Sequence, residues 1–251
     1  EMSAGQRGPE RFLYALLVSL MLIAECAGAT QSTEKVSPPP GTKLCALTFD
    51  DGPDAEKTAR VLDKLDYYGI HATFFWIGQK VAEANRSVMA RLTAGGHEVG
   101  NHSWDHQAMN KLSEDEIRTS VEKTSEAILR YTGKLPRFFR APNLATSALM
   151  YETVPYPFMG GSVIAKDWEP RWGGLPGAEE RAARVLDGIQ DGAIILMHDT
   201  QPDPHPTPEA LDIIIPGLIG KGYHFVTLSE LFKHRNVFPQ AGVEIQWAIV
   251  K

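Results

Sequence analysis

Two adjacent carboxylates, Asp50 and Asp51, follow a short apolar segment and are followed at once by Gly52 and Pro53. Side chains of consecutive strand residues point to opposite faces, but Gly and Pro end a strand, so this turn could aim both carboxylates into one pocket. Two neighbouring carboxylates repel each other, and a nearby cation usually relieves the repulsion. The residues alone leave two interpretations open, an ordinary Asp-Gly turn or an acidic pair that faces a cation.

Two histidines, His102 and His106, are four residues apart. On a helical turn they would lie on one face, where both imidazoles could reach one metal ion. Together with Asp51 they would supply three protein ligands and leave a coordination position open for water, as catalytic metal sites do. The alternative is a pair of surface histidines. The remaining histidines have no such sequence partner and are interpreted as structural or solvated: His71, His97, His205, His224 and His234.

Three more polar residues follow apolar segments. Arg140 comes directly after two phenylalanines, Asp167 precedes Trp168, and His198 ends the apolar run 194–197. Taken singly, Arg140 fits a structural ion pair, and His198 fits a buried core histidine. Because all these polar groups recur at the ends of successive apolar segments, we favour one common site.

The elements that would position these groups alternate along the chain. Strand-like segments are predicted at residues 44–49, 71–77, around 98, 137–140, 158–164, 193–197 and 224–228. Helices are predicted at residues 56–69, 87–94, 113–133, 178–189 and 208–221, with a capping box at Ser113 and Glu116 and a kink at Pro216. This order predicts an α/β fold of about seven strands with a parallel sheet, either closed as an irregular barrel or doubly wound. In both architectures ligands bind at the carboxyl ends of the strands.

The composition and the N-terminal sequence limit the protein class. With 251 residues, 43% hydrophobic residues and a net charge of −6, the chain is globular and lacks the basic surface that nucleic acid requires. Residues 1–29 resemble a secretory signal peptide, with a retained anchor as the alternative, and 30–43 form a proline-rich spacer. We therefore expect an exported protein. Residues 44–235 would form the catalytic domain, 236–251 remain an unassigned tail, and the prediction is a monomer without a stable protein partner.

Five short motifs follow one another across about 150 residues: T-F-D-D-G-P, H-S-x-x-H, R-x-P, D-W and L-x-H. In this order they resemble the motifs of the polysaccharide deacetylases, carbohydrate esterase family 4, which share the NodB-like homology domain. The resemblance extends from Leu44 to about Phe232. It implies a distorted (β/α) barrel and one divalent metal ion, usually zinc, with cobalt, nickel or manganese as alternatives.

The resemblance assigns roles to the residues around the metal. Asp51, His102 and His106 match the metal ligands of the family, and Asp50 matches the general base. Arg140 matches the arginine that orients this base.

The remaining matches concern the leaving group and the acetyl pocket. His198 matches the general acid, and Asp167 matches the carboxylate that tethers it. The substrate-binding positions implied are Pro142, Asn143, Trp168 and Leu196, with the backbone N–H of Asn143 as an oxyanion donor.

Two positions depart from the family pattern. Asn143 stands where the family usually has Tyr, and Ile164 stands where many members carry the first Asp of D-x-x-D-W. Both changes weaken any transfer of substrate identity from the family.

The expected function is a metal-dependent hydrolase that removes acetyl groups from N-acetylglucosamine-containing polysaccharides or oligosaccharides, such as peptidoglycan or chitin. One alternative is an acetylxylan esterase on the same fold, and another is a non-catalytic sugar-binding module. In each case Trp104, Trp168 and Trp172 could stack on sugar rings.

Overall fold

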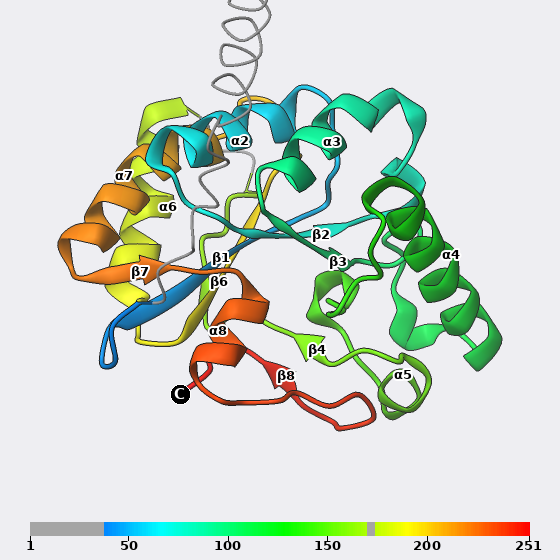
Figure 1. Ribbon diagram of the computed structural model, residues 1–251. Helices are drawn as coiled ribbons and strands as arrows, with labels where there is room; N and C mark the ends of the chain where they lie inside the picture. The colour runs from blue at the N-terminus through cyan, green and yellow to red at the C-terminus, as the bar shows by residue number, and fades with distance from the viewer. Residues whose placement is uncertain (1–37, 170–173) are drawn as a thin grey trace, which may run out of the picture. The chain divides into compact units, whose positions relative to one another are not determined.

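The computed structural model describes residues 38–169 and 174–251 (Figure 1). The predicted signal peptide, most of the spacer and Trp172 lie outside the described residues. None of the helices in the described part of the chain has the length and apolar character needed to cross a membrane.

The central sheet is parallel and is built around strand β1 (Lys43–Asp50). Its strand order is β3-β2-β1-β6-β5, and β7 also pairs with β1. The other strands are β2 (Thr73–Trp76), β3 (Glu98–Asn101), β5 (Val163–Ile164), β6 (Ala193–His198) and β7 (Tyr223–Phe225). In the register of β1 and β6, Asp50 lies beside His198, so two of the predicted catalytic residues meet at the carboxyl end of the sheet.

A second, two-stranded sheet joins β4 (Phe158–Met159) to β8 (Gln246–Trp247) (Figure 1). Isolated bridges connect Phe139 to both Asn101 and Phe158, and Ile249 pairs with Ala193 of β6. These connections close the sheet into the distorted (β/α) barrel that the sequence predicts. The tail 236–251, which the sequence left unassigned, thus supplies β8 and part of the closure.

Two strand predictions differ from the structure. The predicted strand 158–164 is divided into β4 and β5, because Gly160 and Gly161 separate the two short pairings. At Gly161 an added Cβ would come within 2.8 Å of the Leu196 Cβ, so the close approach of the two chains requires glycine. The segment 137–140 contributes only the single bridging residue Phe139 instead of a full strand.

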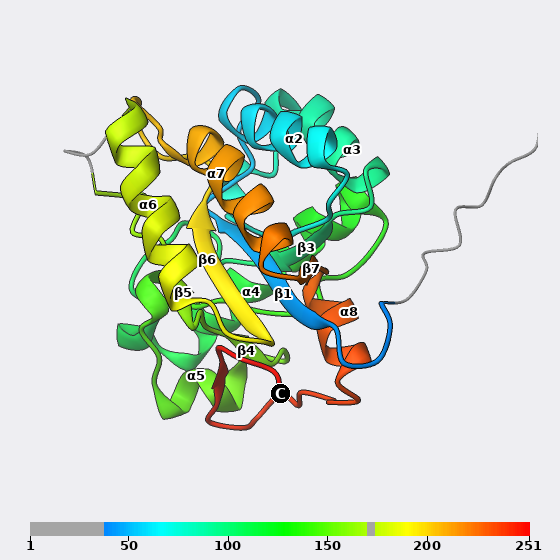
Figure 2. The same cartoon turned by 90° about the vertical axis from the view of Figure 1, so that its left-hand side faces the viewer.

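Helices cover the outside of the barrel, and α6 and α7 lie side by side, with α6 against β5 and α7 against β7 (Figures 1 and 2). Their bounds are α2 (Lys57–Tyr68), α3 (Arg86–Ala94), α4 (Glu114–Thr132), α5 (Ala148–Thr153), α6 (Gly174–Gly188), α7 (Thr207–Gly220) and α8 (Leu228–His234). The capping box of Ser113 and Glu116 is confirmed at the start of α4. Helices α5 and α8 were not predicted, and the strand predicted to reach residue 228 ends at Phe225, because Thr227 caps α8.

Alternation along the strands separates two apolar clusters. On β1, Cys45, Leu47 and Phe49 pack in the cluster under the helices, whereas Leu44 and Ala46 belong to the cluster inside the barrel. Because side chains alternate along a strand, Thr48 and Asp50 share the inner face. By the same alternation on β6, Leu196 and His198 share the inner face with Ile194.

Candidate active site

Asp50 and Asp51 both face the carboxyl end of the barrel, although they are consecutive. Asp50 ends β1 on its inner face, and Asp51 has a left-handed backbone with φ 77°, which redirects its side chain. The Asp50 Oδ2 lies 3.9 Å and the Asp51 Oδ1 3.5 Å from the Nε2 of His102. The two carboxylates of the T-F-D-D-G-P motif therefore lie in one pocket, as an acidic pair would, and the cation that they would face stays a prediction.

His102 and His106 lie together, although residues 102–107 do not form the helical turn considered from their spacing. These residues form an irregular loop in which Ser103 and His106 have φ 67° and φ 62°. The His106 N–H donates a hydrogen bond to Ser103 Oγ at 3.1 Å, and the two imidazole centroids lie 5.0 Å apart. The Nδ1 of His102 lies 2.8 Å from the carbonyl oxygen of Arg140, so its Nε2 is the nitrogen directed at Asp51.

The three residues have the donor set of a metal site. The Oδ1 of Asp51 and the Nε2 atoms of His102 and His106 lie within 4.8 Å of one another. Within the described chain, this buried Oδ1 has no hydrogen-bond partner. Two imidazole nitrogens and one carboxylate oxygen suit zinc and similar divalent ions, and they leave coordination positions for other ligands. The side chains therefore fit the metal that the sequence motifs imply.

The charges of the group act on one another. Although burial opposes its ionisation, the close approach and charge of His102 hold the pKa of Asp51 well below its usual range. Burial and the neighbouring charge of His102 lower the pKa of His106, which favours the neutral imidazole that a metal ion needs.

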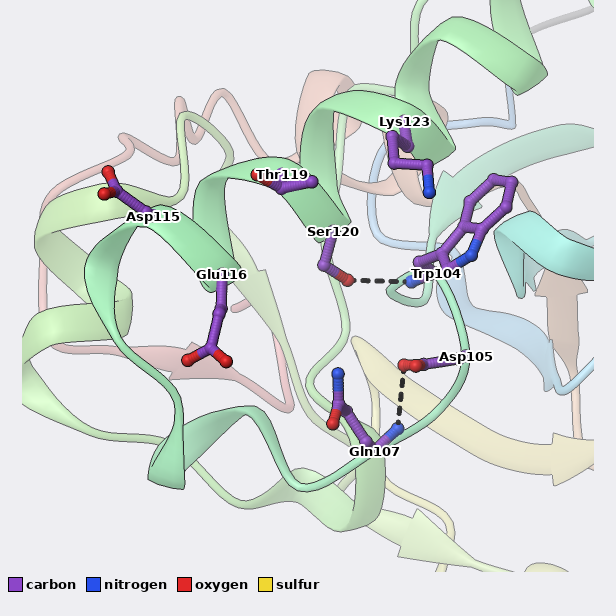
Figure 3. A pocket seen from close by; sticks show the side chains of 8 residues that line it. All are labelled: Trp104, Asp105, Gln107, Asp115, Glu116, Thr119, Ser120 and Lys123. Atoms are coloured by element: carbon purple, nitrogen blue, oxygen red, sulfur yellow. Dashed lines mark hydrogen bonds between the residues drawn. The ribbon is translucent and has the colours of Figure 1, made fainter.

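The loop 102–107, here called the histidine loop, is hydrogen-bonded to the first 3-10 turn, η1 (Gly78–Lys80), and to α4. The backbone N–H of Gly78 donates to the Ser103 carbonyl at 2.9 Å, and the N–H of Trp104 donates to Ser120 Oγ at 2.9 Å. Beside the loop lies a pocket of about 280 Å³ (Figure 3), lined by Trp104, Asp105, Gln107, Asp115, Glu116, Thr119, Ser120 and Lys123. Within it, the Lys123 Nζ lies 4.3 Å from the centroid of the Trp104 ring. That ring is half-buried and lines the pocket, and its stacking on sugar stays a prediction.

The packing of Trp104 leads to a prediction about Gly78. An added Cβ at residue 78 would lie 2.4 Å from a ring carbon of Trp104 and 2.5 Å from Thr124 Oγ1. Gly78→Ala is therefore expected to destabilise the protein by about 1–3 kcal/mol, as overpacking does, measured by denaturant unfolding. Gly220→Ala is the matched control, because nothing lies within 4 Å of its added Cβ. Equal stability of the Gly78 variant and the wild type would contradict this account of the loop.

Arg140 fixes Asp50 from inside the barrel. Its buried guanidinium donates to Asp50 Oδ1 at 2.7 Å and to Thr48 Oγ1 at 2.8 Å, and also to the carbonyl of Gly160 at 2.7 Å. It also stacks over the Phe75 ring, with Cζ 4.2 Å from the centroid. Because Nη1 of Arg140 binds Oδ1 of Asp50, the other carboxylate oxygen, Oδ2, is left to face His102.

His198 is paired with Asp167 on its far side. The His198 Nδ1 lies 2.8 Å from Asp167 Oδ1, and the backbone N–H of His198 donates to Asp167 Oδ2 at 2.7 Å. Thr207 Oγ1 also donates to this oxygen, at 2.6 Å. Burial disfavours the imidazolium, but the charge of Asp167 and its hydrogen bond outweigh burial and raise the pKa of His198 to about 9. At neutral pH His198 is therefore protonated, and its Nε2 is the nitrogen that Asp167 leaves available.

Two of the predicted substrate-binding residues, Leu196 and Trp168, lie beside this pair. Leu196 is buried on the inner face of β6, and Trp168 is 42% exposed, with its ring centroid 5.3 Å from that of His198. Pro142 and Asn143 lie in η4 (Pro142–Leu144), where Asn143 has φ 56°, a left-handed conformation that Asn tolerates better than most residues. Ile164 of β5 pairs with Leu196, next to the site.

Several residues near the site were missed by the sequence analysis. Four of them donate side-chain hydrogen bonds to Asp51 or Asp167: Lys80, Thr200, Gln201 and Thr207. The fifth is Asp199, whose carboxylate accepts a hydrogen bond from Thr58. Asp199 is fully buried against Gly52, and burial raises its pKa to about 7 although Thr58 donates to its carboxylate. Asp199 directly follows His198, the predicted acid, and its position could have suggested a place in the site. No sequence pattern indicates a role for Gln201.

Comparison with known proteins places these residues in a family. The polysaccharide deacetylase family model matches residues 37–154, which include the Asp-His-His group and Arg140. Among solved structures, a family 4 acetyl xylan esterase from Clostridium thermocellum in complex with a cobalt ion is 50% identical, with a TM-score of 0.80, and the alignment covers 83% of this chain and 99% of that one.

Curated relatives agree with this match. A peptidoglycan-N-acetylglucosamine deacetylase of Bacillus cereus is 33% identical over 200 residues, 79% of this chain and 92% of that protein. The bifunctional xylanase/deacetylase of Pseudobutyrivibrio xylanivorans is 41% identical over 209 residues, which make up 83% of this chain but only 33% of that protein. The chain likewise spans about two fifths of the length of several other relatives. The motifs, the barrel and these similarities together establish that the chain belongs to the polysaccharide deacetylase family, carbohydrate esterase family 4.

Proposed function

We propose that this protein is a metal-dependent hydrolase that removes acetyl groups from N-acetylglucosamine-containing polysaccharide of the peptidoglycan or chitin type. One observation carries the proposal: a single site at the carboxyl end of the barrel holds a potential metal-ligand group, a carboxylate fixed by Arg140, and His198 charged by Asp167. Hydrolysis of an amide needs all three functions, because water must be activated and the leaving amine must be protonated.

Asp51, His102 and His106 would hold the metal ion, which we propose to be zinc. When bound, such an ion lowers the pKa of water and polarises the acetyl carbonyl. The nearby Asp50 would act as general base through Oδ2, because Arg140 occupies its Oδ1. Arg140 in this scheme touches the base and not the substrate, so it is a positioning residue.

His198 would act as general acid and protonate the leaving nitrogen from Nε2. Asp167 keeps the ring oriented and charged, since it binds Nδ1 and the backbone N–H of the same residue. The backbone N–H of Asn143 is proposed as a donor to the oxyanion that forms on the acetyl carbon. Leu196 and Trp168 would line the space for the acetyl methyl group.

The pairing of His198 gives a pH prediction for Asp167→Asn. In the wild type, the acid should lose its proton only as the pH rises through about 9. Without the carboxylate, burial would lower the pKa of His198, opposed only by the charges of Asp50 and Asp51. The alkaline limb of kcat on an N-acetylated substrate should therefore move to lower pH, as a pH–rate profile would record. An unchanged alkaline limb in a folded variant would remove Asp167 from this role.

A second candidate is deacetylation of an O-acetyl ester on xylan. It is favoured by the 50% identity to the acetyl xylan esterase of Clostridium thermocellum and by the 41% identity to the xylanase/deacetylase. Ester hydrolysis releases an alcohol, which needs less protonation by a general acid than a leaving amine does. The same residues could therefore serve both reactions. The departures at Asn143 and Ile164 lie where substrate selection would occur.

The deciding experiment measures acetate released from N-acetylated chitooligosaccharides, peptidoglycan and acetylated xylan in parallel. The protein is first treated with a chelator and then assayed with and without added zinc. Zinc-dependent release from the amide substrates supports the main proposal, whereas release from xylan alone supports the esterase. Release that is equal with and without zinc contradicts metal dependence, and no release from any substrate by zinc-loaded protein favours a sugar-binding module. His102→Ala serves as the control that should lose zinc after dialysis.

We also propose that the protein acts outside the cytoplasm as a monomer on its polysaccharide. The signal-like composition of residues 1–29 supports this location. Fractionation of cells that express the full chain, with and without residues 1–29, tests it, and equal retention of both forms in the cytoplasm contradicts it.

A further inference from the structure

The two carboxylate oxygens of Asp51 have different surroundings. The Gln201 side-chain amide donates from Nε2 to Asp51 Oδ2 at 3.2 Å. The other oxygen, Oδ1, lies 3.5 Å from His102 Nε2 and 3.4 Å from His106 Nε2, and it has no hydrogen-bond partner among the described residues. The hydrogen bond thus selects which oxygen faces the two histidines.

The segment that carries Gln201 is also bound to the backbone of Asp51. Thr200 Oγ1 donates to the Asp51 carbonyl at 3.0 Å, and Lys80 Nζ donates to the same oxygen at 2.7 Å. Lys80 also reaches Thr200 Oγ1 at 3.3 Å, so the three side chains form one cluster. Because Asp51 has a positive φ, which is unfavourable for a residue other than glycine, its conformation depends on such external contacts.

We propose that Gln201 is a positioning residue that fixes Asp51 as a one-oxygen metal ligand. The inference rests on the proposed metal-dependent function. By holding Oδ2, the amide stops rotation of the carboxylate and prevents both oxygens from turning to the ion. Gln201 lies three positions after His198, the last residue of β6. The C-terminal end of β6 therefore supplies both the proposed acid and the residue that positions Asp51.

The test compares wild type with Gln201→Met, which keeps the length of the side chain but removes the donor. Loss of an outer hydrogen-bond partner of a metal ligand typically weakens binding by about 10–100-fold. We expect that loss in the affinity of the full chain for Zn²⁺, measured by competition with a chromophoric chelator. Because Co²⁺ absorption reports ligand geometry, the d–d bands of the Co²⁺-loaded variant should also differ from those of the wild type.

Gln240→Met is the matched control, because Gln240 is exposed and its amide donates only to Phe238 of its own loop. It should keep the affinity and the spectrum of the wild type, and circular dichroism of the metal-free proteins should give equal melting temperatures for all three. Wild-type affinity and an unchanged Co²⁺ spectrum in Gln201→Met would overturn the inference while leaving the proposed function intact. Failure of the wild type itself to bind either metal would overturn both.

Discussion

Asp50→Asn is expected to lose about 10²–10⁴-fold in kcat while retaining its metal ion, because removing a general base has an effect of this size. Asn has no basic oxygen, so it cannot accept the proton that Asp50 would take at Oδ2. The ligand group Asp51, His102 and His106 is left chemically unchanged. The loss of kcat is measured on the substrate that the acetate-release assay identifies. Retention of the metal ion is measured as metal content after dialysis.

The same substitution also affects stability, because it removes the partner of a buried charge. Arg140 is fully buried, and breaking a buried ion pair from one side costs about 3–5 kcal/mol. Asn keeps an oxygen that can accept from Arg140, and the guanidinium retains Thr48 and Gly160 as acceptors, so the loss should fall below that range. Unfolding curves separate the two effects. Normal turnover in a folded, metal-loaded variant would exclude Asp50 as the base.

His198→Gln should distinguish amide from ester chemistry. On an N-acetylated sugar we expect a loss of about 10²–10⁴-fold in kcat, because the amine cannot leave without a proton. An activated aryl acetate leaves as a stable phenolate, so its cleavage should fall far less. The ratio of the two rates is therefore the measurement, and it does not depend on the amount of active protein.

The control for this experiment is His224→Gln. His224 is exposed on β7 and pairs with Leu44, at the opposite end of β1 from Asp50. Both rates should remain at the wild-type level in this variant. Equal losses on amide and aryl ester in His198→Gln would argue that the imidazole supports the site by some means other than proton donation.

The site residues whose positions could be predicted from the sequence are those at the ends of strands. Asp50 and His198 end buried apolar segments, and parallel pairing brings such ends together without further information. The helix at residues 114–132 was equally predictable, because its capping box is local. For His102 and His106 the spacing indicated the correct pair but the wrong backbone, since left-handed residues in a loop leave no periodic signal.

Other parts depend on contacts that no local pattern encodes. The two-residue strand β8 exists only because β4 lies beside it, and its sequence carries no alternation long enough to recognise. The amide of Gln201 reaches Asp51 across 150 positions of sequence. Such pairings form only when the barrel closes, so they cannot be predicted from the sequence before the fold is known.

The placement of β1 has a consequence for how the chain acquires its fold. Its hydrogen-bonded neighbours include β6 and β7, and Thr48 bonds the carbonyl of Ile195 across 147 residues. The backbone N–H of Val250 then donates to the carbonyl of Gly192, whose own N–H donates to the carbonyl of Leu44. Contacts between such distant segments must overcome a large loop-closure entropy before they stabilise anything, which slows folding. Although β2 can pair with β1 early, a ribosome would synthesise most of the polypeptide before β6 and β7 can join β1. Until then, part of the apolar surface of β1 would be accessible to chaperones.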